Sequence, residues 1–191
     1  ANGVVVNPKA FIKEIEQIES KGLKTDHVFI SRRSHVIMPY HILLDTYREE
    51  EHGGTQIGTT KKGIGPCYED KIARVGIRMI DLLNPAVLRE KIKKNLKVKN
   101  SLFEKYFEKP GLDEEEIYQE FLALGEKLKD RIVDTELEIN EAIADGKNIL
   151  FEGAQALMLD IDFGTYPYVT SSSPSTGGVC TGAGVPPTAL K

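Results

Sequence analysis

The segment GTTKKGIGPCYEDKIAR, residues 58–74, contains the residue types of a phosphate-binding loop. Gly58 and Gly63 bracket two threonines and two lysines, which is how the triphosphate loop G-x-x-x-x-G-K-S/T begins. Ile64 stands where that loop has its lysine, so a standard triphosphate site is not predicted. A monophosphate needs fewer groups, because backbone N–H groups that glycines allow to turn toward it, a threonine hydroxyl and an arginine are enough to bind it. The alternative interpretation is an ordinary exposed glycine loop before a helix.

A second candidate lies in residues 151–178, which are rich in glycine, serine, threonine and proline. The Gln155 amide suits the edge of a base, and the hydroxyls of residues 170–173 suit a phosphate, although turns use the same residue types. Asp160 and Asp162 offer oxygen ligands to Mg²⁺. Because aspartates also cap turns, we favour turn capping and predict no metal ligand in this chain.

The other reactive side chains show no catalytic spacing. Cys67 and Cys180 lie in neither a C-x-x-C nor a zinc pattern, which predicts unlinked thiols, and Cys67 is expected to pack rather than to attack. The order of the residues supports no arrangement of serine, histidine and acid. The histidines have no metal spacing: His27, His35, His41 and His52.

The elements that position these residues alternate at the start of the chain. We expect strands over residues 4–6, 27–31 and 34–38, and helices over residues 8–20 and 40–51. Asn7 and Pro8 supply the cap and the first-turn proline of the first helix. The alternation favours an α/β fold, a sheet flanked by helices.

Helices are predicted to dominate the middle of the chain. Apolar residues at helical spacing predict helices over residues 69–83, 84–107 and 113–143. The apolar residues of NILFEG predict a core strand over residues 148–153. We therefore divide the chain into three parts. Residues 1–83 form an α/β part that contains the first loop. Residues 84–146 form a helical subdomain to which we assign no chemistry, and residues 147–191 return to the α/β part with the second loop.

Composition narrows the class of partner. The chain has 191 residues, of which 40% are hydrophobic and 28% charged, as in a globular protein. Its net charge of -4 argues against nucleic acid or an anionic membrane as the main partner. No apolar run approaches the roughly 20 residues of a membrane span.

Taken together, the two segments resemble adenylosuccinate synthetases. The core G-I-G-P-x-Y-x-x-K-x-x-R of residues 63–74 is similar to one characteristic motif of that family, and FEGAQALMLDIDFGTYPYVTSSS, residues 151–173, to another. The opening NGVVVNP and the helix around MPYHILLD also fit, so the resemblance runs through the whole sequence. It implies an α/β fold related to P-loop nucleoside triphosphatases.

The resemblance also implies a reaction. Members of that family join IMP to L-aspartate at the expense of GTP, with Mg²⁺, giving adenylosuccinate, GDP and phosphate in AMP biosynthesis. The 6-oxygen of IMP is phosphorylated first, and the aspartate amine then displaces the phosphate. The family also implies a cytoplasmic homodimer.

Four residues match IMP-binding positions of the family. Thr60 and Thr170 match threonines that contact the 5′-phosphate, and Gln155 matches a glutamine near the 6-oxygen of the base. Arg74 matches an arginine that reaches the IMP of the neighbouring subunit, which makes the helix after Glu69 an expected dimer contact.

Some family features are replaced or missing. Ala156, Phe163 and Ser173 stand where glycine, histidine and asparagine are frequent. The sequence contains neither the QWGDEGKGK loop, which supplies the general base, the GTP phosphate cradle and metal ligands, nor the guanine-binding part. We therefore expect an internal fragment that holds no catalytic residue and is inactive alone. The alternative is a stand-alone IMP- or AMP-binding or interaction module.

Overall fold

The computed structural model describes residues 1–51 and 60–191. Helices surround two pairs of parallel strands, which confirms the predicted α/β class. The pairs are β1 (Val5–Val6) with β3 (His35–Val36), and β2 (Ile30–Ser31) with β4 (Ile132–Val133). Parts of the predicted features lie outside the described residues: His52, Gly58 and Thr59, the first of the two threonines that follow Gly58.

The first two helices form as predicted, whereas the strands between them are shorter than expected. They are α1 (Pro8–Glu19) and α2 (Pro39–Glu51). The Asn7 side chain caps α1 by accepting the N–H of Ala10 at 3.2 Å. The strand predicted over residues 27–31 keeps only its last two residues, because Val28 donates to the carbonyl of Thr25 in a turn.

The next helix corrects the prediction for residues 69–83. α3 (Ile64–Ile72) begins earlier, after Gly63 in the left-handed conformation, and ends two residues before Arg74, which has a φ of 64°. The chain then runs beside β3, where the carbonyl of Ile77 accepts the N–H of Val36 at 2.8 Å. Backbone pairing with β3 therefore outweighs the helical spacing of the apolar residues. After α3, the predicted helix over residues 69–83 is reduced to η1 (Met79–Leu83), a short 3-10 helix.

The helices that follow agree with the sequence in part. α4 (Pro85–Lys105) forms as predicted, but residues 113–143 do not form one long helix. They contain α5 (Glu114–Leu128), η2 (Lys129–Arg131), β4 and the start of α6 (Thr135–Ala144). Ile132 and Val133 pair with β2, so a tertiary contact interrupts the helical pattern.

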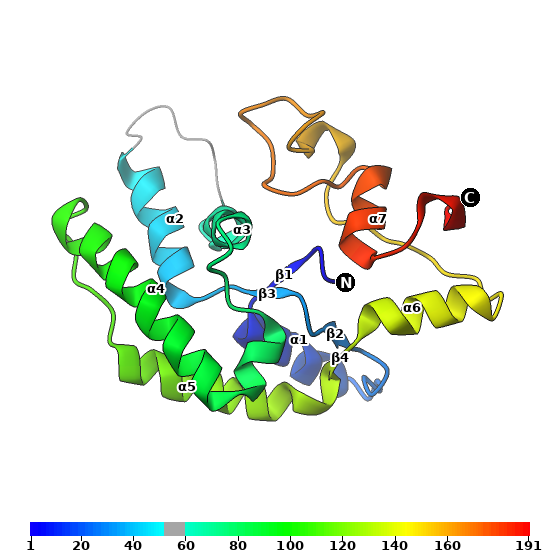
Figure 1. The fold of residues 1–191 in the computed structure, drawn as a ribbon, viewed down its shortest axis with the longest axis horizontal. Coiled ribbons are helices and arrows are strands. Elements are labelled where there is room, and N and C mark those ends of the chain that lie inside the picture. Colours follow the sequence, from blue (N-terminus) through cyan, green and yellow to red (C-terminus); the bar gives the residue numbers. More distant parts are fainter. Residues whose placement is uncertain (52–59) are drawn as a thin grey trace.

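The prediction of a strand over residues 148–153 is wrong. The segment has no strand hydrogen bonds among the described residues, and Leu150 is 89% exposed. It leads to η3 (Leu157–Leu159), α7 (Thr176–Ala183) and η4 (Pro187–Ala189). The N-terminal residues lie beside α7, where the N–H of Gly3 donates to the carbonyl of Gly182 at 2.8 Å, as can be followed in Figure 1.

One apolar core lies between the strands and the central helices. α2, α4, α5 and η1 pack around it, while the segment from yellow to orange in Figure 1 lies on the side of the view opposite α5. Its fully buried members include Val36, Tyr40, Leu44, Leu88 and Phe103. The helices of residues 84–128 thus share their core with the α/β part. The three-part division of the chain stays a prediction.

No helix in the described ranges is long and apolar enough to cross a membrane.

Candidate functional site

The first half of the candidate site is the entrance to α3. Thr60 is exposed and precedes Gly63, whose φ is 75° and whose N–H donates to the Asp45 carboxylate at 2.9 Å. The first turn of a helix leaves backbone N–H groups without helical acceptors, and the helix dipole adds positive charge there. This end of α3 therefore has the properties that attract a phosphate.

The hydroxyl-rich segment meets this end of α3. A Cβ atom added at Gly65 would lie 3.3 Å from Oγ of Ser171, so glycine permits the close approach of the two segments. The hydroxyl of Tyr68 donates to the carbonyl of Gly3 at 2.8 Å, and the nearby Ser172 side chain partly offsets the rise that burial causes in the pKa of Tyr68. Burial raises the pKa of Tyr68, so its hydroxyl stays protonated. Segments about a hundred residues apart in sequence thus form one surface.

Asp160 organises the loop that carries these hydroxyls. Its side chain is inaccessible to solvent and accepts the N–H groups of Asp162 at 2.9 Å, Phe163 at 3.3 Å and Ser175 at 3.2 Å. These hydrogen bonds lower the pKa of Asp160. Next to it, the N–H of Thr170 donates to the carbonyl of Leu159 at 2.8 Å. The predicted turn-capping role is confirmed for Asp160.

The four predicted IMP-binding residues fall in three places. The segment with Thr170 reaches the α3 entrance, which Thr60 precedes. Gln155 is exposed on the loop before η3, with a φ of 75°. Arg74 is exposed beyond the other end of α3, and nine helical residues span about 13 Å. The structure therefore does not bring Arg74 to the two threonines.

A buried polar network behind α3 was not predicted. Asp70 of α3 accepts from His41 of α2 at 2.9 Å and from Lys99 of α4 at 2.7 Å. The sequence contains a signal for it, because Lys99 interrupts the apolar stripe of α4 formed by Ile92, Leu96 and Phe103. A lysine at a position of such a stripe indicates a buried partner.

The remaining predicted residues have structural surroundings. Both cysteines are free, and Cys67 is buried, which confirms that this thiol packs; burial raises its pKa to about 12. Burial, with smaller contributions from nearby Lys71 and Arg78, lowers the pKa of His35 to about 4. In the described part of the chain, no cluster of histidine, cysteine and acidic side chains suits a metal ion.

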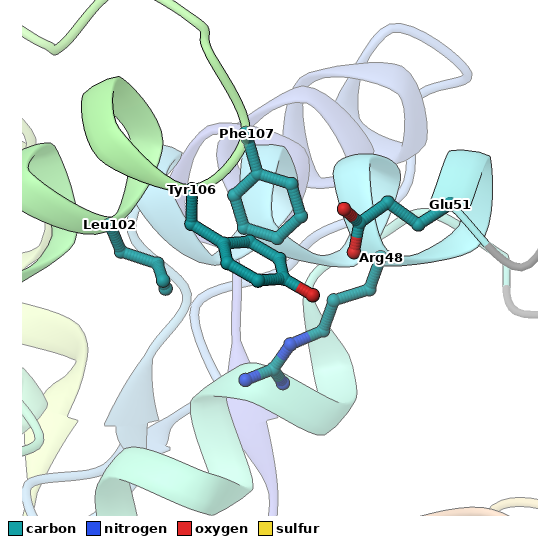
Figure 2. Close-up of a pocket in the computed structure, with 5 residues that line it drawn as sticks. All are labelled: Arg48, Glu51, Leu102, Tyr106 and Phe107. Carbon is teal, nitrogen blue, oxygen red and sulfur yellow. The ribbon is translucent and has the colours of Figure 1, made fainter.

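A surface pocket lies away from the predicted site residues. Figure 2 shows it between α2 and the end of α4, lined by Arg48, Glu51, Leu102, Tyr106 and Phe107, and its volume is about 350 Å³. The guanidinium of Arg48 already binds both oxygens of Glu69 on α3, at 2.6 and 3.3 Å. We therefore assign the candidate site to the α3 entrance and not to this pocket.

Fold and site together define an α/β protein with a helix entrance whose backbone N–H groups suit an anion. Comparison with known proteins narrows this class. The sequence model of adenylosuccinate synthetase matches residues 1–191. The chain belongs to the adenylosuccinate synthetase family.

Individual relatives agree with this assignment. The adenylosuccinate synthetase of Fusobacterium nucleatum is 60% identical over 185 residues, which cover 97% of this chain and 44% of that protein. The Acetivibrio thermocellus enzyme is 58% identical over 186 residues, with the same shares covered. The structure of fully ligated adenylosuccinate synthetase from Plasmodium falciparum superposes with a TM-score of 0.88 at 39% identity, over the whole chain and 44% of that protein. The chain thus spans less than half the length of these relatives.

Proposed function

We propose that this chain forms the IMP-binding part of an adenylosuccinate synthetase. The observation that carries the proposal is the meeting of the α3 entrance with the segment of residues 170–172. Threonine hydroxyls from both segments and the N–H groups of the first turn of α3 suit the 5′-phosphate of IMP. In this proposal Thr60 and Thr170 bind the phosphate, and Gln155 hydrogen-bonds the 6-oxygen of the base.

The proposed reaction joins IMP and L-aspartate. A phosphoryl group passes from GTP to the 6-oxygen of IMP, and the aspartate amine then displaces that oxygen as phosphate, leaving adenylosuccinate and GDP. The part of this work assigned to residues 1–191 is to hold IMP. GTP and Mg²⁺ belong to the proposal for the whole enzyme, and the described residues offer no donor set that fits the metal. We therefore derive no step through Mg²⁺ here.

The proposed enzyme is a cytoplasmic homodimer in which Arg74 reaches the IMP of the partner subunit. Supporting the role of Arg74, this residue is exposed and lies beyond the end of α3 that is opposite to Thr60, with a helix of about 13 Å between them. An arginine is suited to this role because its guanidinium binds a phosphate through two parallel hydrogen bonds.

Calorimetric titration of the 191-residue chain tests the IMP site. We expect IMP to bind and inosine, which lacks the phosphate, to bind at least about tenfold more weakly, since charge-assisted hydrogen bonds to the phosphate contribute most of the affinity. Thr60→Ala should weaken IMP binding and leave inosine binding unchanged. Equal affinities for IMP and inosine would contradict a phosphate site at the α3 entrance.

A second assay tests whether these residues are inactive alone, and AMP binding separates the two functional interpretations. We expect the chain to make no adenylosuccinate from GTP, IMP, aspartate and Mg²⁺, because phosphoryl transfer needs groups that these residues do not supply. Product formation would refute this expectation. The alternative, a stand-alone binding or interaction module, predicts AMP binding as tight as IMP binding and a reading frame without an upstream QWGDEGKGK segment.

A further inference from the structure

Asp70 joins three helices through the two oxygens of its carboxylate. Oδ2 accepts from Nε2 of His41 on α2, and Oδ1 accepts from Nζ of Lys99 on α4. The side chains of His41, Asp70 and Lys99 are only 0%, 4% and 10% exposed. Lysine and aspartate are almost never buried to this degree unless they are paired. The three side chains therefore form one closed network inside the protein.

The protonation of the network is fixed by its surroundings. Nδ1 of His41 accepts the N–H of Met38 at 3.0 Å, so the proton of the neutral ring is on Nε2, facing Asp70. Burial lowers the pKa of His41, although Asp70 opposes this shift. Burial would raise the pKa of Asp70, but hydrogen bonds from His41 and Lys99 outweigh it and hold the pKa below its ordinary value. The network thus contains one ammonium, one carboxylate and a neutral imidazole.

The same face of α3 carries the entrance glycine. Gly63 and Asp70 are seven residues apart, which is about two helical turns. A Cβ atom at Gly63 would lie 2.8 Å from the backbone nitrogen of Ile42 and 2.9 Å from the carbonyl carbon of His41. His41 therefore contacts α3 at two levels, through its backbone at Gly63 and through its side chain at Asp70. A shift of α2 along α3 would disturb both contacts.

Stability alone does not explain a buried network of this kind. Removing a lysine and a carboxylate from water costs about as much as their attraction returns, and apolar side chains of similar size are often as stable or more so. What the hydrogen bonds add is direction, because both oxygens of Asp70 are satisfied at one relative placement of the three helices.

We propose that His41, Asp70 and Lys99 are positioning residues that hold the first turn of α3, and Thr60 before it, in the geometry that receives a nucleotide 5′-phosphate. The inference rests on the proposed IMP site, although none of the three side chains lies at the phosphate position. Through Lys99, α4 takes part in nucleotide binding, although the sequence predicted no chemistry for this helix.

The test removes both charges at once, so that neither is left buried and unpaired. In the double variant Asp70→Leu/Lys99→Met, we expect an unfolding midpoint within about 5 °C of wild type. We expect IMP binding to weaken about tenfold and the amides of residues 64–68 to exchange their hydrogens about tenfold faster. Lys97→Met is the matched control, because Lys97 lies on the same helix but is exposed, and it should change neither quantity.

Each outcome decides the inference. Wild-type IMP affinity and unchanged amide exchange in the double variant would overturn it. A midpoint lower by more than about 10 °C, with faster exchange throughout the core, would show a role in stability only and would also overturn it. If the wild-type chain binds no IMP, the proposed function fails, and amide exchange at residues 64–68 still decides whether the network positions the first turn.

Discussion

The two halves of the candidate phosphate site are built in different ways. The α3 half, residues 60–68, is backed by α2 and by the buried network at Asp70. The loop half, residues 155–173, is largely exposed and is held by backbone hydrogen bonds to Asp160. The first half is therefore positioned by packing from several helices, and the second by hydrogen bonds within the loop, three of which the Asp160 carboxylate accepts. Substitutions should act on the whole fold in the first half and locally in the second.

The largest effect is expected at Gly63. Gly63→Ala places a Cβ atom within 3 Å of the α2 backbone at a φ of 75°, so the substitution adds a steric clash to backbone strain. We expect a loss of about 3 kcal/mol in the free energy of unfolding, measured with denaturant.

A matched glycine separates the two causes. Gly22 has a φ of 79° and no atom within 4 Å of an added Cβ. Gly22→Ala should therefore cost only the backbone strain, about 1 kcal/mol. If the two variants lose equal stability, the contact of Gly63 with α2 does not hold the α3 half in place.

The next effect belongs to the loop half. Asp160→Ala removes the acceptor for the N–H groups of Asp162, Phe163 and Ser175. We expect faster proteolysis within residues 155–175 and IMP binding weakened by about tenfold, while the unfolding midpoint of the core stays unchanged. Asp162→Ala is the control and should leave the loop intact, because only the backbone of Asp162 is bonded to Asp160. A core destabilised by Asp160→Ala would remove the distinction between the halves.

The sequence predicted the α3 half incompletely. Local signals placed α1 and α4, where a capping asparagine and apolar spacing agree, and α2, where apolar spacing follows Pro39. They failed after Ile72, since the chain pairs with β3 there, and at Ile132, which pairs with β2. Pairing between distant segments is not encoded in local periodicity. The network of His41, Asp70 and Lys99 was missed for the same reason.

For the loop half, residue types were more informative than periodicity. The carboxylate of Asp160 caps its turn as its residue type predicts. The strand over residues 148–153 was predicted from apolar residues, but a strand forms only where a neighbour accepts its hydrogen bonds. The roles of Thr60, Arg74, Gln155 and Thr170 stay predictions, since they depend on a ligand rather than on packing.

Tyr68 of the α3 half lies near Ser172 of the loop half, and removal of its hydroxyl should have a smaller effect. Tyr68→Phe keeps the ring but loses the hydrogen bond to Gly3 and the interaction of the hydroxyl with the nearby Ser172 side chain. We expect a loss of about 1 kcal/mol in unfolding free energy and IMP binding weakened roughly fivefold. Tyr106→Phe, at the exposed end of α4, is the matched control. Unaltered IMP binding by Tyr68→Phe would mean that the two halves position themselves independently.

The smallest effect on a single chain is expected at Arg74, which belongs to neither half. Its side chain is exposed, and leucine meets the same backbone strain as arginine at a φ of 64°. Arg74→Leu should therefore change the unfolding free energy by less than about 0.5 kcal/mol.

Mixing variants tests whether Arg74 completes the site of a partner subunit. A dimer of one Thr60→Ala chain and one Arg74→Leu chain contains one site with both native residues, because each chain supplies what the other lacks. In an equal mixture at dimer-forming concentration, roughly one quarter of the wild-type number of tight IMP sites should reappear. If Arg74 acts on the phosphate bound by its own chain, mixing restores none, and the helix length between Thr60 and Arg74 must then be bridged by a movement within one subunit.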